Sequence, residues 1–349
     1  RQPVGRRRGG GGPMSVWAVI LAGGSGTRFW PLSTPERPKQ LLPLVGDRPL
    51  VAQAVQRLQG LVPPERVLIL TGPALVDQIA SAAPEVPASQ ILAEPRAAST
   101  APALTWAAHR IAARDSDAAM LSLHADWAVG DDAAFRTAAG RALEVARERD
   151  VLVTVGVKPS RDETGYGYIV PGKPLGHGRA VVRFVEKPRP ARARQLRRRG
   201  ALWNTGLFAW SAKRFLLEAT AHARELRAAW PALTAGDVAG FFARVRAVAV
   251  DVAVLERTRR LAVVAGRFTW DDIGSWDALL RIRPRDARGN VVVGNVTLSD
   301  DVRRSVIWSE SEHLAVIGVQ DTVVVRANGH TLVTPTGRAE QIKALAQQL

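Results

Sequence analysis

The sequence predicts an α/β fold, in which a mixed, mostly parallel sheet is covered by flanking helices and is followed by a small β-rich C-terminal domain. Two observations predict the sheet. Short runs of β-branched residues and leucine alternate with longer alanine-rich segments from residue 16 to residue 157, and the connections between them are short. A valine-rich stretch over 291–333, interrupted by turn residues, predicts the small domain.

The predicted elements follow one another along the chain. Strands are expected over 16–21, 66–71, 90–92, 118–123 and 151–157, with helices between them over 49–58, 74–82, 100–113 and 133–149. Shorter strands over 165–170, 181–185 and 207–210 indicate an insertion that shapes a pocket, and helices resume over 212–229 and 238–247. A helix near 338–349 is expected to close the chain. We therefore expect a disordered basic leader over 1–14, a catalytic domain over 15–286 and a small β-rich domain over 287–349.

Composition narrows the function classes. The 349 residues include no cysteine, which excludes a disulfide framework, a thiolate nucleophile and a zinc-thiolate site. No apolar run is long enough for a membrane helix, so we expect a cytoplasmic protein with no membrane partner. The net charge of +16 favours a polyanionic partner. Part of that charge lies in the leader, however, and the arginine cluster over 192–199 lacks interleaved aromatic residues, so we expect a solvated helix face and no nucleic acid.

A glycine-rich segment follows the first predicted strand directly. It comprises Leu21, Ala22, Gly23, Gly24, Ser25, Gly26, Thr27 and Arg28. Glycines allow backbone N–H groups to approach an anion closely, and an arginine adds a fork-shaped phosphate ligand. Neither common nucleotide fingerprint is present, since Phe29 stands where a dinucleotide-binding motif needs glycine and no P-loop occurs in the chain. Taken alone, the segment is equally compatible with a plain glycine turn.

Longer motifs extend this segment and carry a resemblance. They are Phe-Trp-Pro-Leu-Ser over 29–33, Pro-Lys-Gln-Leu-Leu-Pro over 38–43, Trp-Asn-Thr-Gly-Leu-Phe over 203–208 and Trp-Asp-Asp-Ile-Gly-Ser-Trp over 270–276. Over residues 16–340 the chain resembles the sugar-phosphate nucleotidyltransferases and, among them, the mannose-1-phosphate guanylyltransferases. The resemblance implies a Rossmann-like, glycosyltransferase-A-like fold. It also implies transfer of GMP from GTP to α-D-mannose 1-phosphate, which gives GDP-mannose and pyrophosphate.

The resemblance implies four catalytic residues, namely Arg28, Lys39, Asp126 and Asp272. Arg28 and Lys39 would serve the phosphates, and the two aspartates would bind Mg²⁺ or Mn²⁺, a role that suits a pair of carboxylates beside phosphate oxygens. The residues alone leave simpler readings open, in which Lys39 is a surface lysine, Asp126 a helix cap and Asp272 a turn residue. Asp126 does, however, follow a predicted strand at its carboxyl end, where open α/β sheets bind ligands.

The same resemblance implies two substrate sites. The nucleotide site comprises residues 21–28 together with Glu94, Thr100 and Ala101, and the sugar-phosphate site comprises Gly165, Tyr166, Glu186, Lys187 and Asn204. Without the resemblance, Glu186 and Lys187 would be an exposed ion pair. The family usually has Arg-Asn where this chain has Ala98 and Ser99, which leaves base selectivity open.

Three rival functions remain at this stage. One is a sugar-phosphate nucleotidyltransferase for another base or sugar, one is a non-catalytic sugar-nucleotide sensor, and one is a nucleic-acid-binding protein. The presence of both aspartates with Arg28 and Lys39 favours an enzyme over a sensor. Longer relatives carry an isomerase domain after the C-terminal portion, and since this sequence stops at residue 349 we expect no isomerase activity. Whether the protein is a monomer or a homodimer is left open.

Overall fold

A computed structural model describes residues 15–24, 26–346 and 348. The predicted leader over 1–14 and Ser25 lie outside the described residues. Nine strands form the main sheet, in the order β3-β2-β1-β4-β9-β6-β10-β8-β7. They are β1 (Val16–Leu21), β2 (Val67–Thr71), β3 (Ile91–Ala93), β4 (Ala119–His124), β6 (Leu152–Val157), β7 (Tyr168–Leu175), β8 (Gly178–Val185), β9 (Leu202–Ser211) and β10 (Leu261–Ala265).

Strand direction in this sheet is mixed and mostly parallel, as predicted. β1 pairs in parallel with β2 and β4, β2 with β3, and β6 with β10, whereas β8 and β9 run antiparallel to their neighbours. Alternation along β1 gives both faces an apolar surface: Ala18 and Ile20 face one core, and Trp17, Val19 and Leu21 face the other. The sheet therefore needs helices on both sides.

Helices cover both faces. α1 (Leu50–Arg57), α2 (Val76–Ala82) and α4 (Asp132–Arg149) pack in one core, and α3 (Thr100–Arg114), α6 (Ala212–His222), α7 (Trp230–Thr234) and α8 (Val238–Arg244) pack in the other. α5 (Pro190–Arg198) buries Ala193 and Leu196 and exposes Arg194, Arg197 and Arg198, so the arginine cluster lies on the outer face of a helix. No helix within the described residues is long and apolar enough to cross a bilayer.

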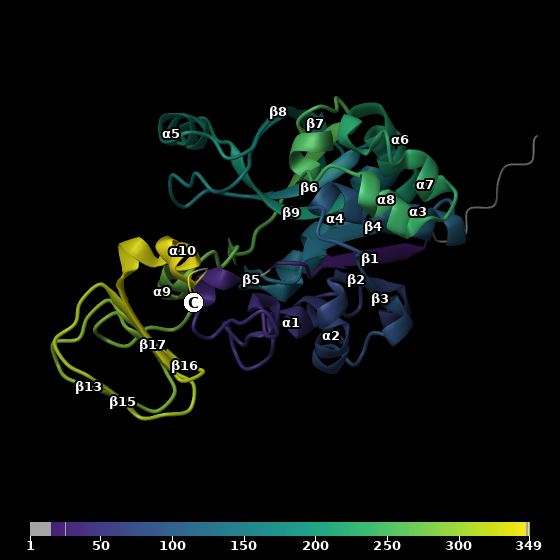
Figure 1. Ribbon diagram of the computed structural model, residues 1–349. Helices are drawn as coiled ribbons and strands as arrows, with labels where there is room; N and C mark the ends of the chain where they lie inside the picture. The colour runs from purple at the N-terminus through teal and green to yellow at the C-terminus, as the bar shows by residue number, and fades with distance from the viewer. Residues whose placement is uncertain (1–14, 25, 347, 349) are drawn as a thin grey trace, which may run out of the picture.

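The C-terminal part is rich in strands, as predicted (Figure 1). One sheet has the order β12-β14-β16-β17 and a second pairs β13 with β15. The strands are β12 (Val291–Val293), β13 (Val296–Leu298), β14 (Val306–Ser309), β15 (Leu314–Val316), β16 (Thr322–Ala327) and β17 (His330–Pro335). In Figure 1 they lie far from α6, α7 and α8, with α9 (Leu279–Ile282) and α10 (Ile342–Ala346) between the two regions. The domain boundary at residue 286 stays a prediction.

A third hydrophobic core joins the segment after the glycine-rich loop to these strands. Phe29 packs on Trp276 with ring centroids 5.1 Å apart, and Trp276 packs on Trp308 of β14 at 5.5 Å. Trp276 also donates from Nε1 to the carbonyl of Trp30, at 3.1 Å. The C-terminal sheet therefore supports the stretch that leads to Lys39.

Several predicted elements differ from the structure. The strand expected over 165–170 begins only at Tyr168, because the preceding backbone is held in a loop by the carboxylate of Glu163. The helix expected near 338–349 is a 3-10 helix over Thr336–Gln341 followed by the short α10. A π-helical turn over Asp251–Leu255 has no counterpart in the sequence-based prediction.

Candidate active site

A small antiparallel sheet brings the two predicted metal-binding aspartates together. β5 (Ala128–Val129) follows Asp126 closely, and β11 (Trp270–Asp271) ends one residue before Asp272. The two strands pair in the register Asp271 with Ala128 and Trp270 with Val129. Asp126 and Asp272, which lie far apart in the chain, therefore meet at the carboxyl end of β4.

Lys39 lies between these two aspartates. Its side chain is almost fully buried, and Nζ donates to Asp126 Oδ2 at 2.9 Å and to the backbone carbonyl of Asp272. Desolvation, the largest single influence, would raise the pKa of Asp126, but Lys39, together with His124 and a backbone hydrogen bond, holds that pKa below its ordinary value. For Asp272, burial raises the pKa, and Lys39 opposes this only in part. The three groups form one electrostatic unit.

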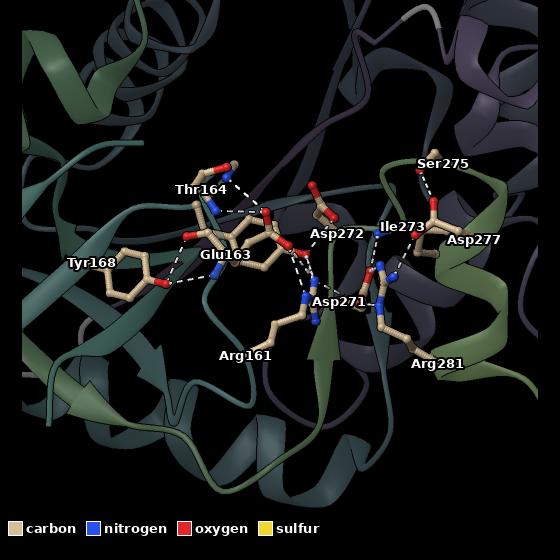
Figure 2. A network of polar contacts seen from close by, with 12 residues as sticks. Arg161, Glu163, Thr164, Tyr168, Asp271, Asp272, Ile273, Ser275, Asp277 and Arg281 are labelled. Atoms are coloured by element: carbon tan, nitrogen blue, oxygen red, sulfur yellow. Dashed lines mark hydrogen bonds and ion pairs between the residues drawn. The ribbon is translucent and has the colours of Figure 1, made fainter. Parts of the chain in front are cut away.

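The neighbouring Asp271 has a different environment. It accepts from Arg281 Nε at 2.9 Å and from the backbone N–H of Ile273 at 2.9 Å. Figure 2 shows Arg281 bridging Asp271 and Asp277, away from Asp272. Of the tandem pair, Asp271 fixes the local backbone and Asp272 faces Lys39.

These two carboxylates suit a hard divalent cation. Within the described residues, no group of three or more His, Asp or Glu side chains is arranged to hold a metal. Mg²⁺ and Mn²⁺ in nucleotide enzymes use one or two carboxylates and take their other ligands from phosphate oxygens and water. Asp126 and Asp272 therefore fit such an ion when a phosphate chain completes its ligands.

A cavity of about 300 Å³ adjoins Asp126. Its lining includes five of the residues predicted to bind nucleotide, namely Leu21, Ala22, Gly23 and Gly24 of the glycine-rich loop and Glu94, which begins the segment over 94–100. Thr100 lines it as well, whereas Ala101 is buried in α3 and does not. Sequence reasoning missed Gln40, which lines the cavity and donates to the carbonyl of Ala22 at 2.8 Å.

Glu94 is the acidic group in this lining. Its side chain is 9% exposed, and burial raises its pKa to about 7. Its Oε1 lies within van der Waals distance of the position that a β-carbon on Gly23 would occupy, 3.6 Å away. A desolvated carboxyl group thus faces the glycine-rich loop across the cavity.

The rest of the loop packs against Lys39. Gly26 has φ +59°, and a β-carbon there would lie 2.6 Å from the backbone nitrogen of Lys39, so only glycine fits. Thr27 and Arg28 follow in a 3-10 helix over Thr27–Phe29, where Arg28 is exposed. The structure therefore brings Lys39 to the loop and leaves Arg28 in solvent.

The segment over 94–100 contains Ala98 and Ser99, the two positions at which the sequence departs from the pattern that the resemblance implies. Both residues line the cavity, and Ala98 is fully buried. Arg96 does not line it, because its guanidinium donates to the carbonyl of Val245. Thr100 accepts from the backbone N–H of Val250 at 2.9 Å, which ties the loop to the segment before the π-helical turn.

The predicted sugar-side residues gather around Asn204. Its Oδ1 accepts from Thr154 Oγ1 at 2.7 Å, and its Nδ2 donates to Asp251 Oδ1 at 2.8 Å. Burial raises the pKa of Asp251. Sequence reasoning missed Asp251, although an isolated acid within an apolar run over 247–255 is a usable signal.

Glu186 lies beside Asn204. A β-carbon on Gly167 would lie 2.6 Å from Glu186 Oε2 and 3.2 Å from the β-carbon of Asn204, so the glycine admits both side chains. Burial, followed by the charge of Asp251, raises the pKa of Glu186 to about 7. Lys187 is two-thirds exposed and its Nζ lies 3.8 Å from Glu186 Oε1, so an ion pair is present, but Glu186 itself is largely buried and the pair is not the exposed one that the residues alone would suggest.

Gly165 and Tyr166 lie on the loop before β7. The backbone N–H of Gly165 donates a hydrogen bond to Glu163 Oε1 at 3.0 Å. The Tyr166 hydroxyl donates to Asp272 Oδ1 at 2.8 Å, so this side chain touches the predicted metal site rather than the group around Asn204. The substrate roles of both residues stay predictions.

Comparison with known proteins agrees with this arrangement. The nucleotidyl transferase family model matches residues 17–289. The chain belongs to the nucleotidyl transferase family. This nucleotidyltransferase is 35% identical to the alginate biosynthesis protein AlgA of Pseudomonas aeruginosa, over 95% of this chain and 71% of that one. It is 34% identical to a mannose-1-phosphate guanylyltransferase of Escherichia coli, over 96% of this chain and 73% of that one. A crystal structure from Thermus thermophilus, described as a "mannose-1-phosphate geranyltransferase", superposes with a TM-score of 0.89 at 34% identity and covers 96% of this chain and 99% of that one.

Proposed function

We propose that this nucleotidyltransferase transfers GMP from GTP to α-D-mannose 1-phosphate, giving GDP-mannose and pyrophosphate. The observation that carries the proposal is the meeting of Lys39, Asp126 and Asp272, because Asp126 also lines the cavity that the glycine-rich loop borders. The names of the Escherichia coli relative and of similar chains support this choice of substrates.

The reaction needs charge neutralisation and alignment more than it needs a nucleophilic side chain. A phosphate oxygen of the sugar phosphate attacks the α-phosphorus of the triphosphate, and pyrophosphate leaves; the attacking phosphate is already ionised, so no general base is required. Lys39 is held rigidly by two partners and so presents a fixed positive charge to the phosphates. Arg28, exposed beside the loop, would serve the departing pyrophosphate.

Asp126 and Asp272 would hold Mg²⁺ or Mn²⁺. The bound ion supplies Lewis-acid neutralisation of the phosphate oxygens. Because Asp126 keeps a pKa below its ordinary value, it is ionised at neutral pH and ready to act as a ligand. The Lys39 ammonium offsets the repulsion between the two carboxylates before a cation arrives.

Glu94 supports guanine as the base. A carboxylate presents two acceptors side by side, and guanine presents adjacent N–H donors on its ring and its exocyclic amine. Such a pair of donors would favour the ionised form of a carboxyl group whose pKa burial has raised to about 7. This contact would replace the family's usual Arg-Asn, where this chain has Ala98 and Ser99.

The test is pyrophosphate release from purified protein with Mg²⁺, with the four common nucleoside triphosphates crossed against mannose 1-phosphate and glucose 1-phosphate. We expect release mainly with GTP and mannose 1-phosphate, and its loss in Asp126→Asn. Release with another pair would keep the chemistry and overturn the substrates, while no release with any pair would favour the sugar-nucleotide sensor.

A further inference from the structure

The loop before β7 is built as one rigid unit. Glu163 Oε1 accepts from the backbone N–H groups of Thr164 and Gly165, at 2.9 and 3.0 Å. The Tyr168 hydroxyl accepts from the backbone N–H of Glu163 at 3.1 Å and donates to its carbonyl at 2.9 Å. Figure 2 shows this network reaching from Tyr168 across to Asp272.

Tyr166 connects the loop to Asp272. Its ring is 6% exposed and packs edge-on between Trp203 and Trp270, with centroid distances of 5.1 and 5.0 Å. Its hydroxyl donates to Asp272 Oδ1 at 2.8 Å. A buried ring held on two sides leaves this hydroxyl one position, so its hydrogen bond holds the Asp272 carboxylate in one orientation.

Arg161 decides the direction of that hydrogen bond. Its Nη2 donates to the Tyr166 hydroxyl oxygen at 3.1 Å, and arginine has no acceptor. The only proton of the hydroxyl is therefore available to Asp272. Arg161 is itself fixed by Glu163, at 2.9 Å, and by stacking over Trp203, at 5.0 Å.

We propose that Tyr166, oriented by Arg161, is a positioning residue that holds the Asp272 carboxylate for the metal ion and so ties the sugar-side loop to the metal site. The inference rests on the proposed function. It assigns Tyr166 to the support of a metal ligand, in place of the direct contact with sugar phosphate that the sequence predicted. A hydrogen-bonded partner of a metal ligand commonly changes metal affinity by about 10-fold to 100-fold when it is removed.

Tyr166→Phe tests this assignment because it keeps the packed ring and removes only the hydroxyl. Tyr168→Phe is the matched control: the second buried tyrosine of the chain bonds through its hydroxyl to the backbone of Glu163. Bound Mn²⁺ is measured by electron paramagnetic resonance in mixtures of protein, GTP and Mn²⁺ without sugar phosphate, so that no turnover occurs. We expect Tyr166→Phe to weaken Mn²⁺ binding about 10-fold and to raise the Mg²⁺ concentration needed for half-maximal pyrophosphate release.

The outcomes separate the two proposals. With an active wild type, the positioning role alone would be overturned if Tyr166→Phe binds Mn²⁺ as tightly as the wild type, or no more weakly than Tyr168→Phe. A wild type that retains no Mn²⁺ and releases no pyrophosphate with any substrate pair would overturn the proposed function. If Tyr166→Phe fails to fold, Arg161→Lys tests the positioning role in its place. This variant removes the guanidinium fork that orients Tyr166 and is also expected to weaken Mn²⁺ binding.

Discussion

Replacing Glu94 by glutamine should make the protein more stable and less active. Glu94 is buried with a pKa raised from 4.5 to about 7, so the folded protein binds its proton more tightly than the unfolded chain does. Protonated Glu94 therefore makes its whole contribution to the free energy of unfolding below about pH 4.5. This contribution falls as the pH rises and is lost above about pH 7. Relative to low pH, ionisation of Glu94 lowers the free energy of unfolding by about 3 kcal/mol at pH 8 and by about 1 kcal/mol at pH 5.5.

The assay is urea unfolding of the wild type and Glu94→Gln at these two pH values. Because glutamine does not titrate, the stability difference between the two proteins should widen by about 2 kcal/mol in favour of the variant from pH 5.5 to pH 8. Glu65→Gln, at an exposed glutamate, controls for general charge effects and should change stability by less than about 0.5 kcal/mol. A difference that stays constant with pH would refute the reasoning. The KM for GTP should rise at least about 10-fold in Glu94→Gln, because the amide offers guanine a donor where it needs an acceptor.

Three further substitutions test other parts of the site. Gly26→Ala should lower kcat by about 100-fold because a β-carbon there collides with the backbone of Lys39. Gly24→Ala, where a β-carbon meets nothing within 4 Å, should keep the wild-type melting temperature; calorimetry and kinetics on both variants check this. Asn204→Ala should raise the KM for sugar phosphate about 10-fold and lower the unfolding free energy by about 1–3 kcal/mol, since it removes a hydrogen-bond partner from the buried Thr154 and from the half-buried Asp251. Initial rates and denaturant unfolding measure the two effects. Trp308→Ala should lower the free energy of unfolding by about 3–5 kcal/mol and should also lower kcat. Ile307→Ala, on the opposite face of the same strand, should lower the free energy of unfolding by about 2–5 kcal/mol and leave kcat unchanged. A similar kcat in the two variants would contradict this.

The sequence predicts those parts of the fold that depend on local periodicity. β1 has the bounds expected because its apolar residues alternate between two cores, and Asp126 was expected beside a ligand because it follows β4 directly. Periodicity cannot predict β5 and β11, which have two residues each, yet their pairing is what brings Asp272 to Asp126. From the residues alone, Asp272 therefore stays a turn residue, and only the resemblance points to its role.

Other site residues could not be predicted because contacts with distant parts of the chain decide where their side chains lie. Tyr166 belongs to a segment with the composition of a strand, but the carboxylate of Glu163 binds the backbone before it and turns the segment into a loop. Asp251 stands in an apolar run without a motif, and its role depends on Asn204, which β9 brings from elsewhere in the chain. The Arg96 side chain points to the carbonyl of Val245, to which it donates a hydrogen bond, and no local sequence pattern specifies this contact.

The third core connects strands remote from the cavity to two groups that the proposed mechanism uses. Lys39 lies between Phe29 and Leu42 in the sequence, and both are fully buried against the core that contains the C-terminal strands. Trp276, four residues after Asp272, occupies the same core and packs on Trp308. The lysine and the aspartate that it contacts are therefore anchored on either side to one apolar cluster. Loosening that cluster would move both groups at once, and a displacement of about 1 Å can cost roughly 100-fold in rate. Under the proposed function, the C-terminal sheet therefore supports catalysis even though it contributes no residue to the cavity.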